Sequence, residues 1–127
     1  MATFYLMPEL SNFTAEFFKA LAHPLRVKIL DGLRSGEVGV NDLSARLKVE
    51  QSTLSRQLSV LRSSNIVVGR QQGQNVFYSV RDPEIFRLLD DARRIFNNHL
   101  IDIQDLLSQL APSPPASPPG TGREPDK

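Results

Sequence analysis

The chain lacks cysteine and contains only two histidines, His23 and His99, among its 127 residues. The absence of cysteine excludes disulfides, thiolate metal sites, iron–sulfur clusters and cysteine nucleophiles. A catalytic zinc site in one chain usually needs two or three histidines, so this complement disfavours that chemistry. No apolar run approaches the roughly 18–20 residues that span a bilayer. The first stretch, MATFYLMPELSN, has no basic residue and too short an apolar run for a secretory signal. We therefore expect a cytoplasmic protein.

Motifs of enzyme active sites are missing as well. The sequence contains no glycine-rich phosphate loop, because Gly69 and Gly73 fall in a predicted hairpin. Serine, histidine and aspartate are present, but no spacing indicates a catalytic triad. The sequence therefore predicts that the chain is not an enzyme.

Acidic residues are scarce in the middle of the chain. Residues 43–81 contain six Lys or Arg and one acid, Glu50, which gives a net charge of +5. Residues 1–42 and 82–110 carry net charges of −1 and −3. A basic segment between acidic ones predicts an anionic partner for the middle of the chain. The alternative is that the six basic residues form a solvated surface.

The C-terminal segment differs in composition from the rest. Residues 111–127 contain six prolines and no large apolar side chain. Such a segment cannot bury enough surface to offset its ordering entropy, so we expect it to be disordered or extended. Its proline spacing also allows docking to a proline-binding domain. We expect residues 1–110 to form the folded, dimerising domain and 111–127 a proline-rich tail.

Apolar residues recur at helical spacing along most of the chain. The predicted helices cover, in order, 10–21, 24–33, 42–48, 52–64 and 83–110. Between the last two helices the apolar residues alternate with a period of two, which predicts a hairpin with 71–75 at its tip. A lone hairpin is marginally stable, so we expect this one to pack on the helices.

Residues suited to helix ends stand at several of these boundaries. His23 precedes Pro24, and proline fits the first turn of a helix. Asn41 is predicted to cap the helix over 42–48. Asn65 suits the left-handed residue that ends the next helix. Asp82 is predicted to cap the last helix.

The last predicted helix carries an uninterrupted heptad seam from Ile85 to Leu110. This helix is longer than a core of about 75 residues can cover, so a second copy of the chain is its natural partner. The helix over 10–21 carries more phenylalanines than one buried helix face needs, so some of them are expected to contact another helix or another subunit. The predicted dimer-interface residues are Phe13, Phe17, Ile85, Leu89, Phe96, His99, Ile103 and Leu106.

A short helix, a tight turn, a longer helix and a basic hairpin make a helix-turn-helix followed by a wing. With Leu54, Leu58 and Leu61 buried, the outer face of the longer helix holds small or hydrogen-bonding residues and no acid. Such a face suits an approach to phosphates and base edges; the alternative is a serine-rich surface helix. The predicted DNA-binding residues are Ser52, Thr53, Ser55, Arg56, Gln57, Ser59, Arg62, Arg70, Gln72 and Gln74.

Three stretches of the chain resemble the ArsR/SmtB-type winged-helix transcriptional regulators: FFKALAHPLRVKILDGL, QSTLSRQLSVLRSSNIV and RQQGQNVFYSV. The resemblance covers about residues 13–100. It implies a mainly α winged helix-turn-helix with a two-stranded β wing, in the order α-α-α-α-β-β-α. It further implies a homodimer formed through the first and last helices, and a cytoplasmic repressor that leaves inverted-repeat operator DNA when an effector binds. The alternative is a metal-independent winged-helix module for protein or RNA interaction.

The metal motifs of that family are largely missing. Members that sense soft metals carry a Cys-x-Cys element before the recognition helix, and the matching stretch DLSARL has none. Zinc- and nickel-type members carry Asp-x-His on the last helix and, ten residues later, His-x-x-Glu or His-x-x-His. The matching positions here are Asp82, Glu84, Ile95 and Asn98, so both imidazoles are absent.

His99 is the remaining candidate ligand. It lies in the seam, where a two-fold dimer brings it near its own copy or near Asp102. A nickel or zinc effector would therefore bind at the interface, through His99 and nearby carboxylates of both chains such as Asp102. Asp82 and Glu84 are the oxygen ligands that survive from the family's motif. The alternative for His99 is a polar residue with satisfied hydrogen bonds that sets the register of the seam. The alternatives for the effector are a small organic molecule, a redox signal or no effector at all.

Overall fold

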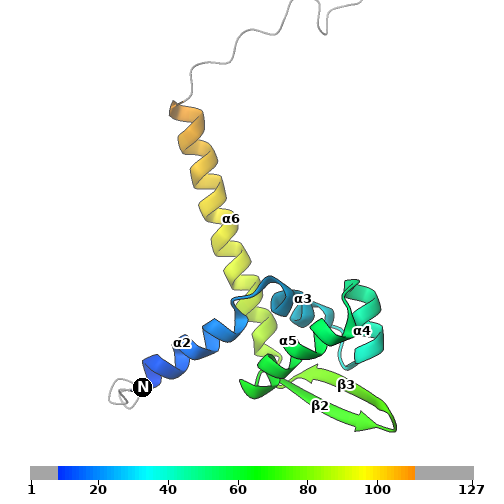
Figure 1. Cartoon of the computed structure of the whole chain (residues 1–127). Helices are drawn as coiled ribbons and strands as arrows, with labels where there is room; N and C mark the ends of the chain where they lie inside the picture. Colours follow the sequence, from blue (N-terminus) through cyan, green and yellow to red (C-terminus); the bar gives the residue numbers. More distant parts are fainter. Residues whose placement is uncertain (1–8, 111–127) are drawn as a thin grey trace, which may run out of the picture. The chain divides into compact units, whose positions relative to one another are not determined.

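The computed structural model describes residues 9–110 of the chain (Figure 1). The predicted proline-rich tail, residues 111–127, lies outside this range. Among the described residues, no helix is long and apolar enough to cross a membrane. The elements are α2 (Leu10–Leu21), α3 (Pro24–Gly32), β1 (Val38–Gly39), α4 (Val40–Leu47), α5 (Gln51–Ser63), β2 (Val67–Gln72), β3 (Asn75–Val80) and α6 (Glu84–Leu110).

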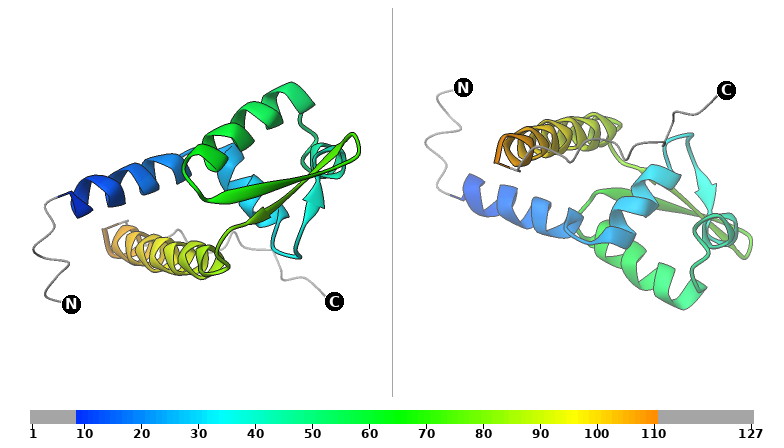
Figure 2. Two further views of the ribbon diagram at one scale, coloured as in Figure 1. Left: turned by 90° about the horizontal axis from the view of Figure 1, so that it is seen from below. Right: turned by 90° about the horizontal axis from the view of Figure 1, so that it is seen from above.

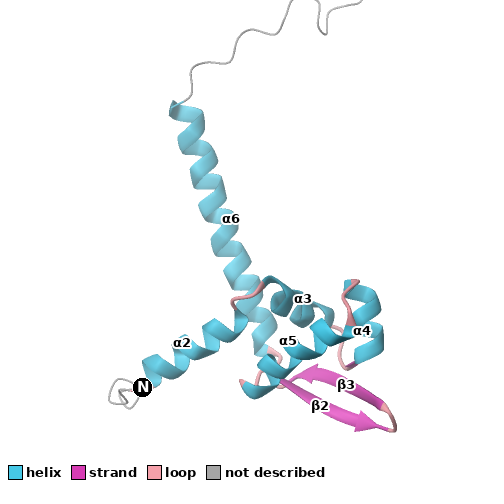
Figure 3. Cartoon of the chain, in the orientation of Figure 1, coloured by secondary structure: helices cyan, strands magenta, loops and turns pink. Residues whose placement is uncertain are grey.

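The predicted fold class is confirmed: helices dominate, and the strands gather into one small antiparallel sheet (Figure 3). The sheet has three strands in the order β1-β3-β2, so the two-stranded wing has a third partner that the sequence did not predict. Val38 and Gly39 pair with Tyr78 and Phe77 on β3. A strand of two residues is too short to show a period of two, and the glycine at Gly39 predicted a loop instead.

Most of the predicted helix ends are confirmed. The Nδ1 atom of His23 accepts a hydrogen bond from the Leu25 amide at 3.1 Å, so His23 caps α3 ahead of Pro24. The carboxylate of Asp82 accepts a hydrogen bond from the Glu84 amide at 3.0 Å at the start of α6. The prediction that Asn41 is a cap is wrong. Helix α4 begins two residues earlier than predicted, after Gly39, and the side chain of Asn41 instead accepts a hydrogen bond from Gln51.

Asn65 ends the α5 segment in the left-handed conformation, with φ +61°, as predicted. The amide of Ile66 donates to the Leu61 carbonyl at 2.9 Å, and the amide of Asn65 donates to the Arg62 carbonyl at 3.0 Å. This pair of hydrogen bonds is a Schellman motif, which satisfies the last carbonyls of the helix. The chain then turns directly into β2.

The hydrophobic core lies between α3, α4, α5 and the sheet, and these elements cluster together in both views of Figure 2. The predicted stripe of α5, Leu54, Leu58 and Leu61, is completely buried. Gly32 allows α3 and α4 to pack closely, because a Cβ atom there would lie 2.8 Å from a methyl group of Leu43. The other buried hydrophobic residues are Ala20, Leu21, Ile29, Leu30, Leu33, Val38, Leu43, Ile66, Val67, Ile85 and Leu89.

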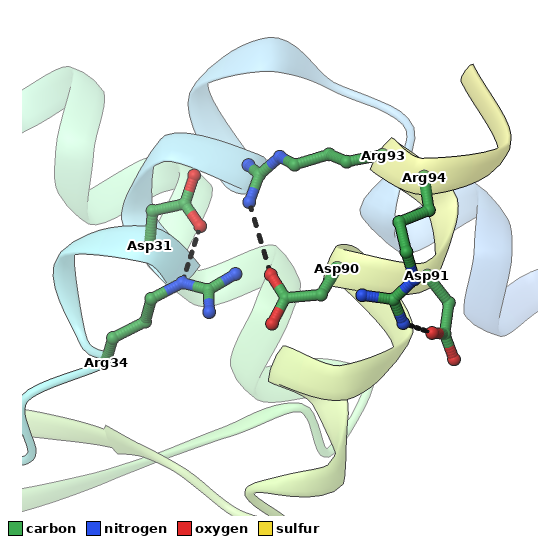
Figure 4. A network of polar contacts seen from close by, with 6 residues as sticks. All are labelled: Asp31, Arg34, Asp90, Asp91, Arg93 and Arg94. Atoms are coloured by element: carbon green, nitrogen blue, oxygen red, sulfur yellow. Dashed lines mark hydrogen bonds and ion pairs between the residues drawn. The ribbon is translucent and has the colours of Figure 1, made fainter. Parts of the chain in front are cut away.

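The chain divides into two compact units between Leu89 and Asp90, so α6 contributes to both. In the first unit, Ile85 and Leu89 belong to the core. In the second unit the helix surface carries ion pairs three residues apart, Asp90–Arg93 at 3.9 Å and Asp91–Arg94. Figure 4 shows both, together with the Asp31–Arg34 pair of the first unit at 3.0 Å. Exposed pairs of this kind contribute little to stability.

The left-handed conformation of Asn65 predicts opposite effects of two small substitutions. Asn65→Ala is expected to lower the free energy of unfolding by about 1 kcal/mol, because a Cβ-bearing residue without a polar side chain is strained at positive φ. Asn65→Gly is expected to leave stability unchanged or raise it. Urea denaturation followed by circular dichroism measures both. Equal losses for the two variants would contradict the assigned conformation.

Candidate nucleic-acid interface

Helices α4 and α5 are joined by a tight turn in which Lys48 takes the left-handed conformation, with φ 56°. The Val49 amide donates to the Ser44 carbonyl at 3.1 Å, and the Ser44 hydroxyl donates back to the Val49 carbonyl. The side chains of Asn41 and Gln51 join the two helices at their N-terminal ends. These contacts hold α4 and α5 as a helix-turn-helix, in which α5 is the second helix.

The outer face of α5 is free of acidic side chains, as predicted. Helical geometry places this face opposite the buried leucines, so their burial determines which side chains point outward. Small hydroxyls and two guanidinium groups therefore occupy one continuous polar surface. Its exposed members are Ser52, Ser55, Arg56, Ser59 and Arg62, with Thr53 half-buried beside them.

Gln57 lies at the margin of this face, half-buried, and one of its atoms is already engaged. Its carbonyl oxygen accepts a hydrogen bond from Nε of Arg26 at 2.8 Å. The Nη1 atom of Arg26 also donates to the carbonyls of Ala20 and Lys19, at 3.2 and 3.4 Å. One arginine of α3 therefore holds the end of α2 and a side chain of α5 together. No sequence pattern indicates this contact, because 31 positions separate its side-chain partners.

The wing formed by β2 and β3 lies beside α5, and β2 packs against it (Figures 1 and 2). Gln72 pairs with Asn75 at the end of the ladder, so the turn consists of Gly73 and Gln74. Gly73 has φ +63°, a conformation that glycine adopts without strain. The exposed amides of Gln72 and Gln74 surround this turn, as expected for the tip of a wing.

Arg70, a predicted DNA-binding residue of the wing, forms its hydrogen bonds within the chain. Its Nε and Nη2 atoms donate to the two carboxylate oxygens of Glu37, at 2.9 and 2.7 Å. Its Nη1 atom donates to the side-chain oxygen of Gln72 at 2.9 Å. The guanidinium carbon lies 5.1 Å from the centre of the Phe77 ring. Arg70 is therefore paired within the chain, whereas the sequence predicted a side chain free for DNA.

The pairing also affects the protonation of both groups. The hydrogen bonds from Arg70 lower the pKa of the Glu37 carboxyl below its ordinary value. The same contact raises the pKa of Arg70. Glu37 was not among the predicted site residues, because it lies 33 positions before Arg70, ahead of the unpredicted strand β1.

The predicted interface residues fall into two groups. Ile85 and Leu89 are each only 7% exposed, because they pack into the core of the chain itself. Phe17 is half-buried against that core. The other predicted members, Phe13, Phe96, His99, Ile103 and Leu106, are exposed.

The predicted metal ligands are spread along α6. Asp82 and Glu84 stand at its start, where the Asp82 carboxylate accepts the Glu84 amide. His99 and Asp102 are exposed in the second unit. Within residues 9–110, no group of three or more histidine, aspartate or glutamate side chains lies close enough together to hold a metal ion.

The chain is similar to known proteins over most of its length. The family model of the bacterial regulatory proteins of the arsR family matches residues 23–68. An HTH-type transcriptional regulator of Mycobacterium tuberculosis is 41% identical over 97 residues, which are 76% of this chain and 85% of that protein. The biofilm growth-associated repressor of Agrobacterium fabrum is 39% identical over 65% of this chain and 70% of that protein.

Solved structures give the same result. The crystal structure of the M. tuberculosis regulator superposes with a TM-score of 0.67 at 40% identity, covering 76% of this chain and 96% of that one. The homodimeric winged helix-turn-helix DNA-binding domain of a possible ArsR-family regulator from Mycobacterium bovis superposes with a TM-score of 0.65 at 30% identity. That comparison covers 72% of this chain and 84% of the other. The chain thus belongs to the ArsR family of bacterial regulatory proteins, and it is a DNA-binding transcriptional regulator rather than an enzyme.

Proposed function

We propose that the chain is a homodimeric repressor that reads an inverted-repeat operator in duplex DNA with α5 and the wing. The observation that carries the proposal is the exposed, acid-free outer face of α5, whose rotation is fixed by three fully buried leucines. A helix of this kind fits the major groove, where guanidinium and hydroxyl groups reach base edges and phosphates. The relatives named as repressors support the direction of regulation.

Arg56 is the side chain we assign to base reading. It is exposed at the centre of the outer face of α5, and its planar guanidinium can donate two hydrogen bonds to guanine. Ser52, Ser55, Ser59 and Arg62 are assigned to phosphates and neighbouring base edges. The amide of Gln74 and the amide nitrogen of Gln72, whose oxygen accepts from Arg70, are assigned to the adjacent backbone or minor groove.

Arg56→Ala is expected to weaken binding to an operator duplex by about 1–3 kcal/mol and to relax the preference at one base pair. Arg87→Ala, on the acidic segment of the chain, is the matched control and is expected to bind as the wild type does. The operator is first isolated as a fragment of genomic DNA that the wild type binds. Fluorescence anisotropy with this labelled duplex then measures the affinity of both variants. Unchanged affinity and selectivity for Arg56→Ala would contradict the assignment of the reading face.

Dimer formation is supported by the exposed apolar surface of the second unit. At about 100° per residue, all the large apolar side chains of residues 92–110 except Ile101 gather on one side of α6, with His99 among them. Five members of this surface are between 38 and 61% exposed: Phe96, Leu100, Ile103, Leu106 and Leu107. A contiguous apolar surface of this kind marks an interaction site. The M. bovis relative is a homodimer, and we propose the same for this chain, through α2 and α6.

Phe96→Asp is expected to convert the dimer into a monomer, because an unpaired carboxylate would be buried in the interface. Ile101 is 54% exposed, but it lies on the opposite side of the helix. Ile101→Asp is therefore the matched control and should remain dimeric. Light scattering at micromolar concentration should give twice the chain mass of 14.2 kDa for the wild type and the control. A monomeric wild type would contradict the two-fold model of operator binding.

An effector metal would find few ligands in this chain. With no cysteine in the chain, we expect no tight response to soft metals. A borderline ion such as nickel or zinc would bind between protomers, where His99 and Asp102 of both chains come together.

Calorimetric titration of the dimer with nickel and zinc is expected to show no sub-nanomolar site. Any weaker binding should disappear in His99→Ala, because that substitution removes the imidazole from both protomers. A flat titration would identify a metal-independent repressor. Sub-nanomolar binding that survives His99→Ala would show that the metal site lies elsewhere.

A further inference from the structure

Arg70 is the only Lys or Arg between Arg62 and Arg81, so it is the single cation of the wing strands. In the free chain it forms a two-pronged ion pair with Glu37. The wing therefore carries no uncompensated positive charge, although it belongs to the most basic part of the sequence. This is an unexpected arrangement for a segment that approaches a polyanion.

The three-stranded sheet builds this pair. Arg70 on β2 is opposite Phe77 on β3, and Phe77 is in turn opposite Gly39 on β1. A Cβ atom at Gly39 would lie 3.2 Å from the Phe77 ring, so the glycine leaves room for that ring. The arginine stacks on the ring and reaches Glu37, which directly precedes β1. The short strand β1 thus brings an acid to the wing.

The donors that Glu37 occupies are those that a phosphate would use. A guanidinium presents parallel N–H groups that fit carboxylate and phosphate oxygens in the same two-pronged geometry. The Nε and Nη2 edge cannot serve both anions at once. Gln72 and the Phe77 ring hold the guanidinium independently of Glu37. Arg70 can therefore exchange one anion for the other without losing its position.

The pair is also weak enough to exchange. The side chains of Arg70 and Glu37 are 52% and 37% exposed, so water screens their attraction. Ion pairs of this exposure contribute little net stability. In duplex DNA, the phosphates on either side of the contacted one also attract the guanidinium. This added attraction favours the Arg70–phosphate contact over the Arg70–Glu37 pair. The released carboxylate then faces DNA and is repelled.

We propose that Glu37 is an internal competitor of DNA phosphate for Arg70, which lowers the affinity of the wing for duplex DNA of any sequence. This inference rests on the proposed function, because it assumes that the wing approaches DNA. The consequence is a lower affinity for duplex DNA as a whole. Base contacts by α5 are unaffected by Glu37, whereas the phosphate contact of the wing is weakened in operator and non-operator complexes alike.

A double-mutant cycle tests the proposal with full-length protein and a labelled duplex of random sequence. Glu37→Gln keeps the shape of the side chain and removes its charge. We expect it to bind the duplex about two- to tenfold more tightly than the wild type. In the Arg70→Gln background, the same change should give a much smaller gain, because no guanidinium remains to be released. Glu50→Gln, which removes an exposed acid at the start of α5, reports the general effect of one negative charge.

Three outcomes would overturn the proposal. A gain of equal size with and without Arg70 would show that Glu37 acts only through its general charge. Unchanged affinity in Glu37→Gln would show no competition, and weaker binding would show that Glu37 orders Arg70 for DNA. Thermal melting of each variant verifies the fold. If Arg56→Ala weakens operator binding while the cycle shows no coupling, this inference fails alone. If the wild type does not bind duplex DNA, the proposed function fails as well.

Discussion

Burial of the leucine stripe of α5 determines which side chains this helix exposes to solvent. Leu54, Leu58 and Leu61 are completely inaccessible, and they attach α5 to the rest of the core in a single rotation. Because side chains leave a helix at fixed angles, that rotation decides that Arg56 and the serines face outward. Turning the helix by half a turn would bury charges without partners and expose the leucines, which the free energy of transfer forbids. The packing of the core therefore determines which side chains form the outer face of α5, the surface that we propose binds DNA.

The parts of the fold that could be predicted are those that local chemistry specifies. Helical spacing of apolar residues predicted every described helix to within about two residues, and the proline after His23 and the asparagine at Asn65 marked their ends correctly. The prediction that Asn41 caps a helix was wrong, although its side chain suits a cap, because that side chain accepts a hydrogen bond from Gln51 across the turn. Gly39 takes the capping position instead.

The parts that could not be predicted depend on residues far apart in sequence. The contact of Arg26 with Gln57 and the pair of Arg70 with Glu37 both join segments about thirty positions apart. Strand β1 leaves no pattern of its own, because two residues cannot display a period. The seam of α6 was predicted as one surface. The structure divides it: Ile85 and Leu89 pack into the core, and the exposed apolar residues begin beyond them.

The hydrogen bond between Arg26 and Gln57 has a consequence for how bases are read. A free glutamine can recognise adenine with two hydrogen bonds, because its oxygen accepts from N6 while its nitrogen donates to N7. Here the oxygen of Gln57 is already taken by Nε of Arg26. One lone pair of that oxygen is thus used within the chain, and the amide N–H groups keep their full capacity to donate. If Gln57 approaches DNA, its orientation is set by Arg26, and donation to acceptors such as guanine O6 and N7 or thymine O4 costs no contact within the protein.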